Sequence, residues 1–122
     1  MKVKIDTKEK FHVITPQDAF LTANMTEDMI QKLLSYIIND TKNVILNLKM
    51  VEGIDQSIAK SLIKLQTNFY EKNASFVICE MQQIVLDTFE ELEVIDQINY
   101  TLTESEAWDI VQMEEIEREY LD

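Results

Sequence analysis

Two short apolar runs, each followed by a segment with helical periodicity, constrain the fold of this chain more than any other feature. Residues 43–48 and 75–79 are rich in branched apolar side chains, which is typical of strands buried on both faces. The segments that follow place apolar residues every three or four positions, as amphipathic helices do. Strands joined through a crossover helix lie parallel in one sheet. The pattern therefore predicts an α/β domain with a largely parallel sheet.

The N-terminal part of the chain is expected to add an antiparallel edge to this sheet. Val3 and Ile5 alternate with polar residues, which is the period of a half-buried strand. A short polar turn connects them to a second run over residues 11–14, so the two should pair as a hairpin. The helix that follows is expected to be capped by Thr26 and to end near residues 39–40.

The C-terminal part is expected to contain a third helix near residues 82–92 and a marginal strand over residues 98–102. Thr103 and Glu106 form a capping box that opens a fourth helix. Its last part, about 113–122, is acidic and is expected to be an exposed or fraying helical end.

Taken together, these elements predict a single domain over residues 1–122. It should hold a mixed sheet of four to five strands and about four helices.

The net charge of −12 narrows the class of partner. Residues 103–122 alone carry eight acidic residues against one arginine. A strongly acidic body repels phosphate backbones and anionic lipid head groups, so nucleic acids and membranes are not expected as partners. The chain also lacks an apolar run long enough to span a bilayer. A protein with a basic face is the expected partner, and the domain itself should be a monomer or a weak homodimer.

Several classes of chemistry lack the residues that they require. Gly53 is the only glycine, whereas nucleotide-binding loops need several so that backbone amides can approach phosphates. Cys79 is the only cysteine and His12 the only histidine, which leaves little material for a metal site or a catalytic triad. We expect no cofactor, no metal and no catalytic residues, with Cys79 in a buried strand and His12 at a sheet edge. A reducing cytoplasm suits this composition.

The second helix opens with a candidate contact site. Asp55 can cap it by accepting a hydrogen bond from the backbone amide of Ser57 or Ile58. The stretch from Val44 to Ser57 resembles the signature of the STAS family, the anti-sigma-factor antagonists, in which a buried strand and a short apolar loop precede an Asp-Ser-Ser-Gly sequence that begins a helix. The later helices and strands follow the family in order, so the resemblance covers nearly the whole chain and implies the STAS fold.

The resemblance also implies a function. In the family, a serine kinase that doubles as an anti-sigma factor binds this helix start and phosphorylates a serine there, which releases the complex. Ser57 stands at that serine, and Asp55, Gln56, Ser57 and Ile58 are the expected partner-binding residues.

The sequence departs from the family pattern at three positions of interest. Gln56 replaces the first serine, Ile58 replaces the glycine that would let a partner backbone come close, and Glu93 replaces a second glycine. These departures leave open a static STAS-like adaptor or scaffold that is not phosphorylated. A small hydrolase with Ser57 as nucleophile and Asp55 as helper is a further alternative. It lacks a base beside the serine and the Gly-x-Ser-x-Gly elbow.

Overall fold

A five-stranded mixed sheet organises the structure, a computed structural model that describes residues 2–38 and 41–121. The strand order is β1-β2-β4-β6-β7. β1 is antiparallel to β2, and every other neighbouring pair is parallel, as the sequence predicts. The strands are β1 (Val3–Thr7), β2 (Phe11–Pro16), β4 (Asn43–Asn47), β6 (Phe76–Cys79) and β7 (Tyr100–Thr101).

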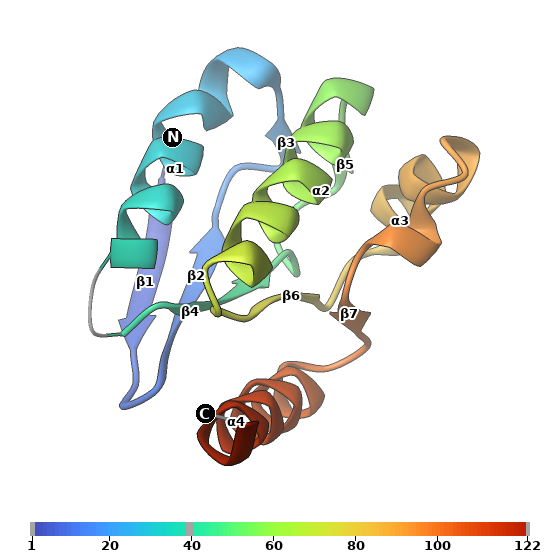
Figure 1. Cartoon of the computed structure of the whole chain (residues 1–122). Helices are drawn as coiled ribbons and strands as arrows, with labels where there is room; N and C mark the ends of the chain where they lie inside the picture. The colour runs from blue at the N-terminus through green and yellow to red at the C-terminus, as the bar shows by residue number, and fades with distance from the viewer. Residues whose placement is uncertain (1, 39–40, 122) are drawn as a thin grey trace.

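Helices cover both faces of this sheet (Figure 1). Within the described ranges these are α1 (Ala23–Ser35), α2 (Gln56–Glu71), α3 (Gln83–Glu91) and α4 (Glu104–Leu121), with short 3-10 turns η1 (Tyr36–Ile38) and η2 (Ile95–Gln97). α1, α2 and α3 contribute to one hydrophobic core, and α4 contributes to a second core on the other face. The single-domain α/β fold is confirmed, and so is the predicted order of the four helices and of the five strands of this sheet.

Alternation along the central strands explains the two cores. In β4, Val44 and Leu46 point toward the α1–α3 layer, while Ile45 points toward α4. In β6, Phe76 contributes to the first core and Val77 to the second. Successive side chains of a strand point to opposite faces, so a strand covered by helices on both sides must be apolar throughout. Both strands are fully buried, which confirms the prediction for residues 43–48 and 75–79.

A second, two-stranded parallel sheet lies beside the first helices and was not predicted. β3 (Phe20–Leu21) pairs with β5 (Gly53–Ile54). In this pairing Phe20 lies opposite Gly53, and Leu21 lies opposite Ile54. Gly53 permits this close approach, because a Cβ added to it would lie 3.0 Å from Cδ1 of Phe20 and the ring would have to shift. The pairing fixes the loop that leads into α2.

The predicted start of the first helix is wrong. α1 begins at Ala23 with Thr22 as its N-cap residue, and Thr26 lies inside the helix with its side chain buried. The Thr26 hydroxyl donates to the carbonyl oxygen of Thr22 at 2.9 Å, which satisfies it within the helix. The predicted end near residues 39–40 lies outside the described residues.

The last strand is shorter than predicted. β7 spans only two residues of the expected 98–102 run, and η2 precedes it. The predicted start of the fourth helix is confirmed, because the Thr103 hydroxyl accepts a hydrogen bond from the backbone amide of Glu106 at 3.2 Å.

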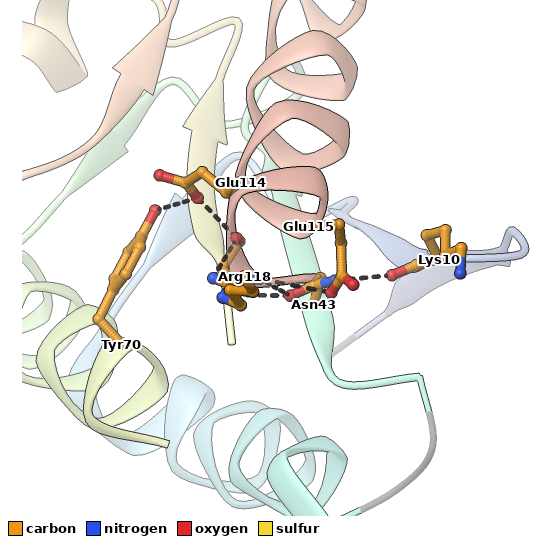
Figure 2. A network of polar contacts seen from close by, with 7 residues as sticks. Lys10, Asn43, Tyr70, Glu114, Glu115 and Arg118 are labelled. Atoms are coloured by element: carbon orange, nitrogen blue, oxygen red, sulfur yellow. Dashed lines mark hydrogen bonds and ion pairs between the residues drawn. The ribbon is translucent and has the colours of Figure 1, made fainter. Parts of the chain in front are cut away.

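The acidic end of α4 is helical and largely exposed, as expected, and polar contacts of its inner side chains hold it against the rest of the domain instead of leaving it to fray. Arg118 donates to the Ser75 hydroxyl at 2.7 Å and to Glu115 at 3.3 Å (Figure 2). Glu114 accepts hydrogen bonds from the Tyr70 hydroxyl at 2.8 Å and from Ser75 at 2.6 Å. α4 therefore stays helical to Leu121, although its outer side chains remain exposed.

Candidate functional site

The start of α2 is held in place from two directions. Asp55 is its N-cap residue, and its Oδ1 accepts a hydrogen bond from the backbone amide of Ile58 at 3.1 Å. On the other side, the backbone amide of Asp55 donates to the carbonyl oxygen of Leu21 in β3 at 3.3 Å. This confirms the predicted cap and identifies Ile58 as its partner. The corner between β5 and α2 is therefore a fixed feature of the fold.

Ser57 presents its hydroxyl on the surface beside this cap. Its Oγ donates to Oδ1 of Asp55 at 2.6 Å, and the side chain is exposed. The pKa of Asp55 is lowered, chiefly because Ser57 donates to the carboxylate and also because backbone amides, including that of Ile58, donate to it. The hydroxyl is thus oriented by a carboxylate and remains accessible to another molecule.

The four residues expected to contact a partner divide into two groups. Asp55, Gln56 and Ser57 are all exposed and share the first turn of α2. Ile58 is 1% exposed and belongs to the main core, together with Leu62 one turn later. The structure does not place the Ile58 side chain with the other three, because it faces the sheet. The residue that stands where the resemblance expects glycine fills the interior beneath the helix start.

A shallow groove of about 300 Å³ runs between α1 and α2 next to Ser57. Glu27 and Gln31 of α1 line one wall, and Ser57 and Ser61 of α2 line the other. The sequence does not predict this groove, because it arises where two helices that are far apart in the chain pack side by side. The structure brings the first turns of the two helices together.

An exposed aromatic side chain lies near the same corner. Phe20 is 63% exposed and packs over Gly53, two positions before Asp55. A single exposed apolar side chain is common on protein surfaces, so it is the position of the ring beside the α2 start, and not its exposure, that connects Phe20 to the site. No periodic pattern surrounds Phe20 in the sequence, so only the pairing of β3 with β5 reveals it.

His12 lies in the interior of the sheet, so its predicted position at an edge is wrong. Its strand, β2, is flanked by β1 and β4. The ring is 8% exposed, stacks on Tyr36 at 4.1 Å between centroids, and approaches the Thr41 carbonyl oxygen through Nε2 at 3.1 Å. Burial lowers the pKa of His12.

The structure keeps His12 away from the α2 start. His12 pairs with Val44 at the beginning of β4, whereas Ser57 comes after the end of that strand and after β5. The fold therefore brings Asp55 and Ser57 together and leaves His12 away from both of them.

Cys79 is buried at the end of β6, as predicted. Burial and the nearby carboxylates of Glu104 and Glu80 raise its pKa to about 12. The thiol is therefore protonated at neutral pH and is a poor nucleophile. In the described part of the chain, no group of three or more His, Cys, Asp or Glu residues is arranged to hold a metal ion.

No α-helix within residues 2–38 and 41–121 has the length and apolar character needed to cross a bilayer.

Comparison with known proteins identifies similar domains across most of the chain. A family model described as STAS domain matches residues 2–107. A search of curated proteins gives no match. Among solved structures, a STAS domain protein from Planctomyces limnophilus is 16% identical, with a TM-score of 0.75, and the match covers 90% of this chain and 97% of that one.

Two further solved structures carry informative descriptions. SpoIIAA, a Bacillus anti-sigma factor antagonist solved in unphosphorylated form, is 16% identical over 91% of this chain and 96% of its own, with a TM-score of 0.73. It has also been solved phosphorylated. A variant of RsbS from Moorella thermoacetica in which glutamate replaces a serine is 17% identical over 92% and 96% of the two chains, with a TM-score of 0.76. At these identities the similarity establishes the fold.

Proposed function

This chain belongs to the STAS domain family, and from that premise we propose that it is a regulatory protein-binding module whose partner is released by phosphorylation of Ser57. The observation that carries the proposal is the exposed Ser57 hydroxyl, held by Asp55 at the start of α2. Asp55 and Gln56 complete the contact surface with Ser57, and Phe20 extends it. The module acts by binding and performs no chemistry of its own.

The physical chemistry of the helix start suits such a switch. A phosphoryl group adds about −1.5 to −2 charges at pH 7. Free backbone amides and the helix dipole stabilise negative charge at a helix N-terminus. Asp55 and Glu52 oppose the added charge, and Asp55 would lose the hydrogen bond that Ser57 donates. The fold should therefore tolerate the modification, while a partner surface fitted to a neutral hydroxyl should not.

The proposed partner is a serine protein kinase that also serves as an anti-sigma factor. The family supports this, as does the similarity to SpoIIAA, which is described as an anti-sigma factor antagonist and exists in phosphorylated and unphosphorylated forms. We place the chain in the cytoplasm, where such a kinase has ATP, and we propose that it acts as a monomer or weak dimer.

The hydrolase alternative is not favoured by the geometry of the site. A serine nucleophile needs a base that can take its proton. The side chain that Ser57 contacts is Asp55, whose pKa is lowered and which is therefore a weak base. The buried ring of His12 lies at the other end of the strands.

Phosphorylation in the native host tests the proposal. The tagged chain is produced in its own cells, and its intact mass is measured before and after phosphatase treatment. Ser61 lies one turn after Ser57 and lines the same groove, so Ser61→Ala is the matched control. We expect one phosphoryl group on the wild type and on Ser61→Ala, and none on Ser57→Ala.

A chain that is never phosphorylated, but still binds its partner through the α2 start, would instead be the static adaptor. In that case the departures at Gln56 and Ile58 would mark the loss of the phosphorylation site.

A further inference from the structure

Helix α4 carries an apolar stripe on the side that faces away from the sheet. Its inner residues Ala107 and Val111 are fully buried against the second core. On the outer side, Met113 and Ile116 are each 53% exposed and Tyr120 is 85% exposed. Residues spaced three and four apart lie on one helix face, so these three form a continuous stripe. Figure 1 shows α4 alone on its side of the sheet.

Acidic side chains border this stripe without basic partners. Glu106, Asp109, Glu117 and Glu119 are exposed. Arg118 is the only basic residue of α4, and it is turned toward Ser75. Among the residues that the structure describes, none of these four carboxylates takes part in an ion pair. The outer face of α4 is therefore both apolar and strongly anionic.

A groove of about 460 Å³ extends the stripe toward the β1–β2 turn. Phe11, Trp108 and Ile116 supply its apolar lining, and the Phe11 and Trp108 rings meet edge to face with centroids 5.0 Å apart. Two lysines and three glutamates also line the groove, which leaves it less anionic than the outer face of α4: Lys8, Lys10, Glu9, Glu115 and Glu119. Lys8 is paired with Asp6 at 3.1 Å. The groove can receive a bulky apolar side chain from a segment lying along α4.

Charge decides which occupant fits this surface. A second copy would bring two equally anionic faces together, which like-charge repulsion disfavours. An anionic bilayer would be repelled for the same reason. A segment that is apolar on one face and basic at its borders matches both features. Met113 and Tyr120 are about 10 Å apart along the helix axis, which corresponds to two turns of a partner helix.

We propose that the outer face of α4 is a second docking surface, which binds a basic amphipathic helix of a partner protein. It lies on the sheet face opposite α1 and α2, so it is separate from the Ser57 surface and leaves that surface free. One domain could then bind two partners at once. Binding at the α2 start would be regulated by phosphorylation of Ser57, and binding at the α4 face would not be.

A model peptide tests this docking surface on the full chain. The probe is a synthetic amphipathic peptide of leucine and lysine, about 18 residues long so that it can form a helix. Its control keeps the leucines and replaces each lysine with glutamate. Binding is followed by amide NMR spectra of the labelled chain. We expect the lysine peptide to shift signals of residues 105–121, and the glutamate peptide to shift none.

Surface variants distinguish peptide binding at the apolar stripe from nonspecific electrostatic binding to an acidic protein. The double variant Ile116→Ser and Tyr120→Ser should weaken lysine-peptide binding by about tenfold or more, as expected when central apolar contacts are lost. The control Ile38→Ser and Ile84→Ser removes exposed apolar residues elsewhere and should leave binding unchanged.

Three results would overturn the proposal: no shifts in α4, equal binding by both peptides, or equal binding by both double variants. A homodimer in sedimentation that Ile116→Ser dissociates would also overturn it, because the face would then belong to a second copy. None of these measurements depends on Ser57.

Discussion

At the scale of single residues, the proposed function rests on the hydrogen bond between Ser57 and Asp55, whose atoms are 2.6 Å apart. Ser57 could have been a plain first-turn residue, and the sequence alone does not show where its hydroxyl points. In the structure it donates to Asp55, which also accepts from the amide of Ile58. The Asp55 carboxylate therefore both caps the helix and orients the Ser57 hydroxyl, so a change in its protonation would affect the cap and the hydroxyl together.

This coupling predicts the pH response of Asp55. Its pKa in the folded chain is lowered, first by the hydrogen bond from Ser57. A carboxyl group whose pKa is lower in the folded state stabilises the fold above its unfolded pKa of about 3.9, and this contribution is lost as the pH falls through the folded pKa. We expect Ser57→Ala to raise the pKa of Asp55, measured by NMR titration of its carboxyl carbon.

Gln56→Ala is the control for this titration, because Gln56 is exposed in the same turn and is not among the causes of the shift. An Asp55 pKa that is the same in wild type and in Ser57→Ala would contradict the proposed orientation of the hydroxyl.

At the scale of secondary-structure elements, α4 shows that acidic residues in a charged run can form structural hydrogen bonds. The run of glutamates after Met113 predicts a solvated end, yet Glu114 accepts a hydrogen bond from Tyr70 of α2 and Glu115 accepts one from Asn43 at the start of β4. Asn43 completes the network by donating to the Lys10 carbonyl oxygen at 2.9 Å (Figure 2). Buried polar groups need hydrogen-bond partners, and here the strands and α4 satisfy one another.

Removing Arg118 should therefore destabilise the whole domain. Arg118→Met keeps much of the side-chain length but removes the hydrogen bonds to Ser75 and Asn43 and the ion pair with Glu115. Hydrogen bonds that involve a charged group contribute about 1.5–3 kcal/mol. We expect the free energy of unfolding, measured by urea denaturation, to fall by roughly that amount.

Glu117→Gln is the matched control, since Glu117 is exposed on the same helix; we expect a change within about 0.5 kcal/mol. Equal midpoints for Arg118→Met and wild type would mean that the network does not anchor α4.

At the scale of the whole molecule, the sequence predicts the architecture better than the connections within it. Apolar strands such as 75–79 and the periodicity of α2 predict the parallel sheet and its helices, because burial on two faces leaves a strong pattern. β3 and β5 are only two residues long, too short for any period to appear.

Individual positions were missed for reasons that are also physical. Thr26 followed by two acids looks like a cap, but its hydroxyl can equally bond to a carbonyl one turn earlier inside the helix. His12 looks like an edge residue because the sequence does not tell which strand lies outside β2. Asp55 could be predicted as a cap because a capping residue and its helix are local in sequence, and Ser57 was singled out by the resemblance to the STAS family. Phe20 reaches the site only through a nonlocal pairing.

The central claim is that Ser57 controls partner binding without changing the fold, and copurification from the native host tests it most directly. Tagged wild type, Ser57→Asp and Ser61→Asp are isolated from their own cells, and the amount of ATP-binding serine kinase recovered with each is measured by mass spectrometry. Thermal unfolding of all three verifies that each is folded. We predict that wild type and Ser61→Asp retain the kinase and that folded Ser57→Asp does not. Equal recovery of the kinase with all three proteins would contradict the claim.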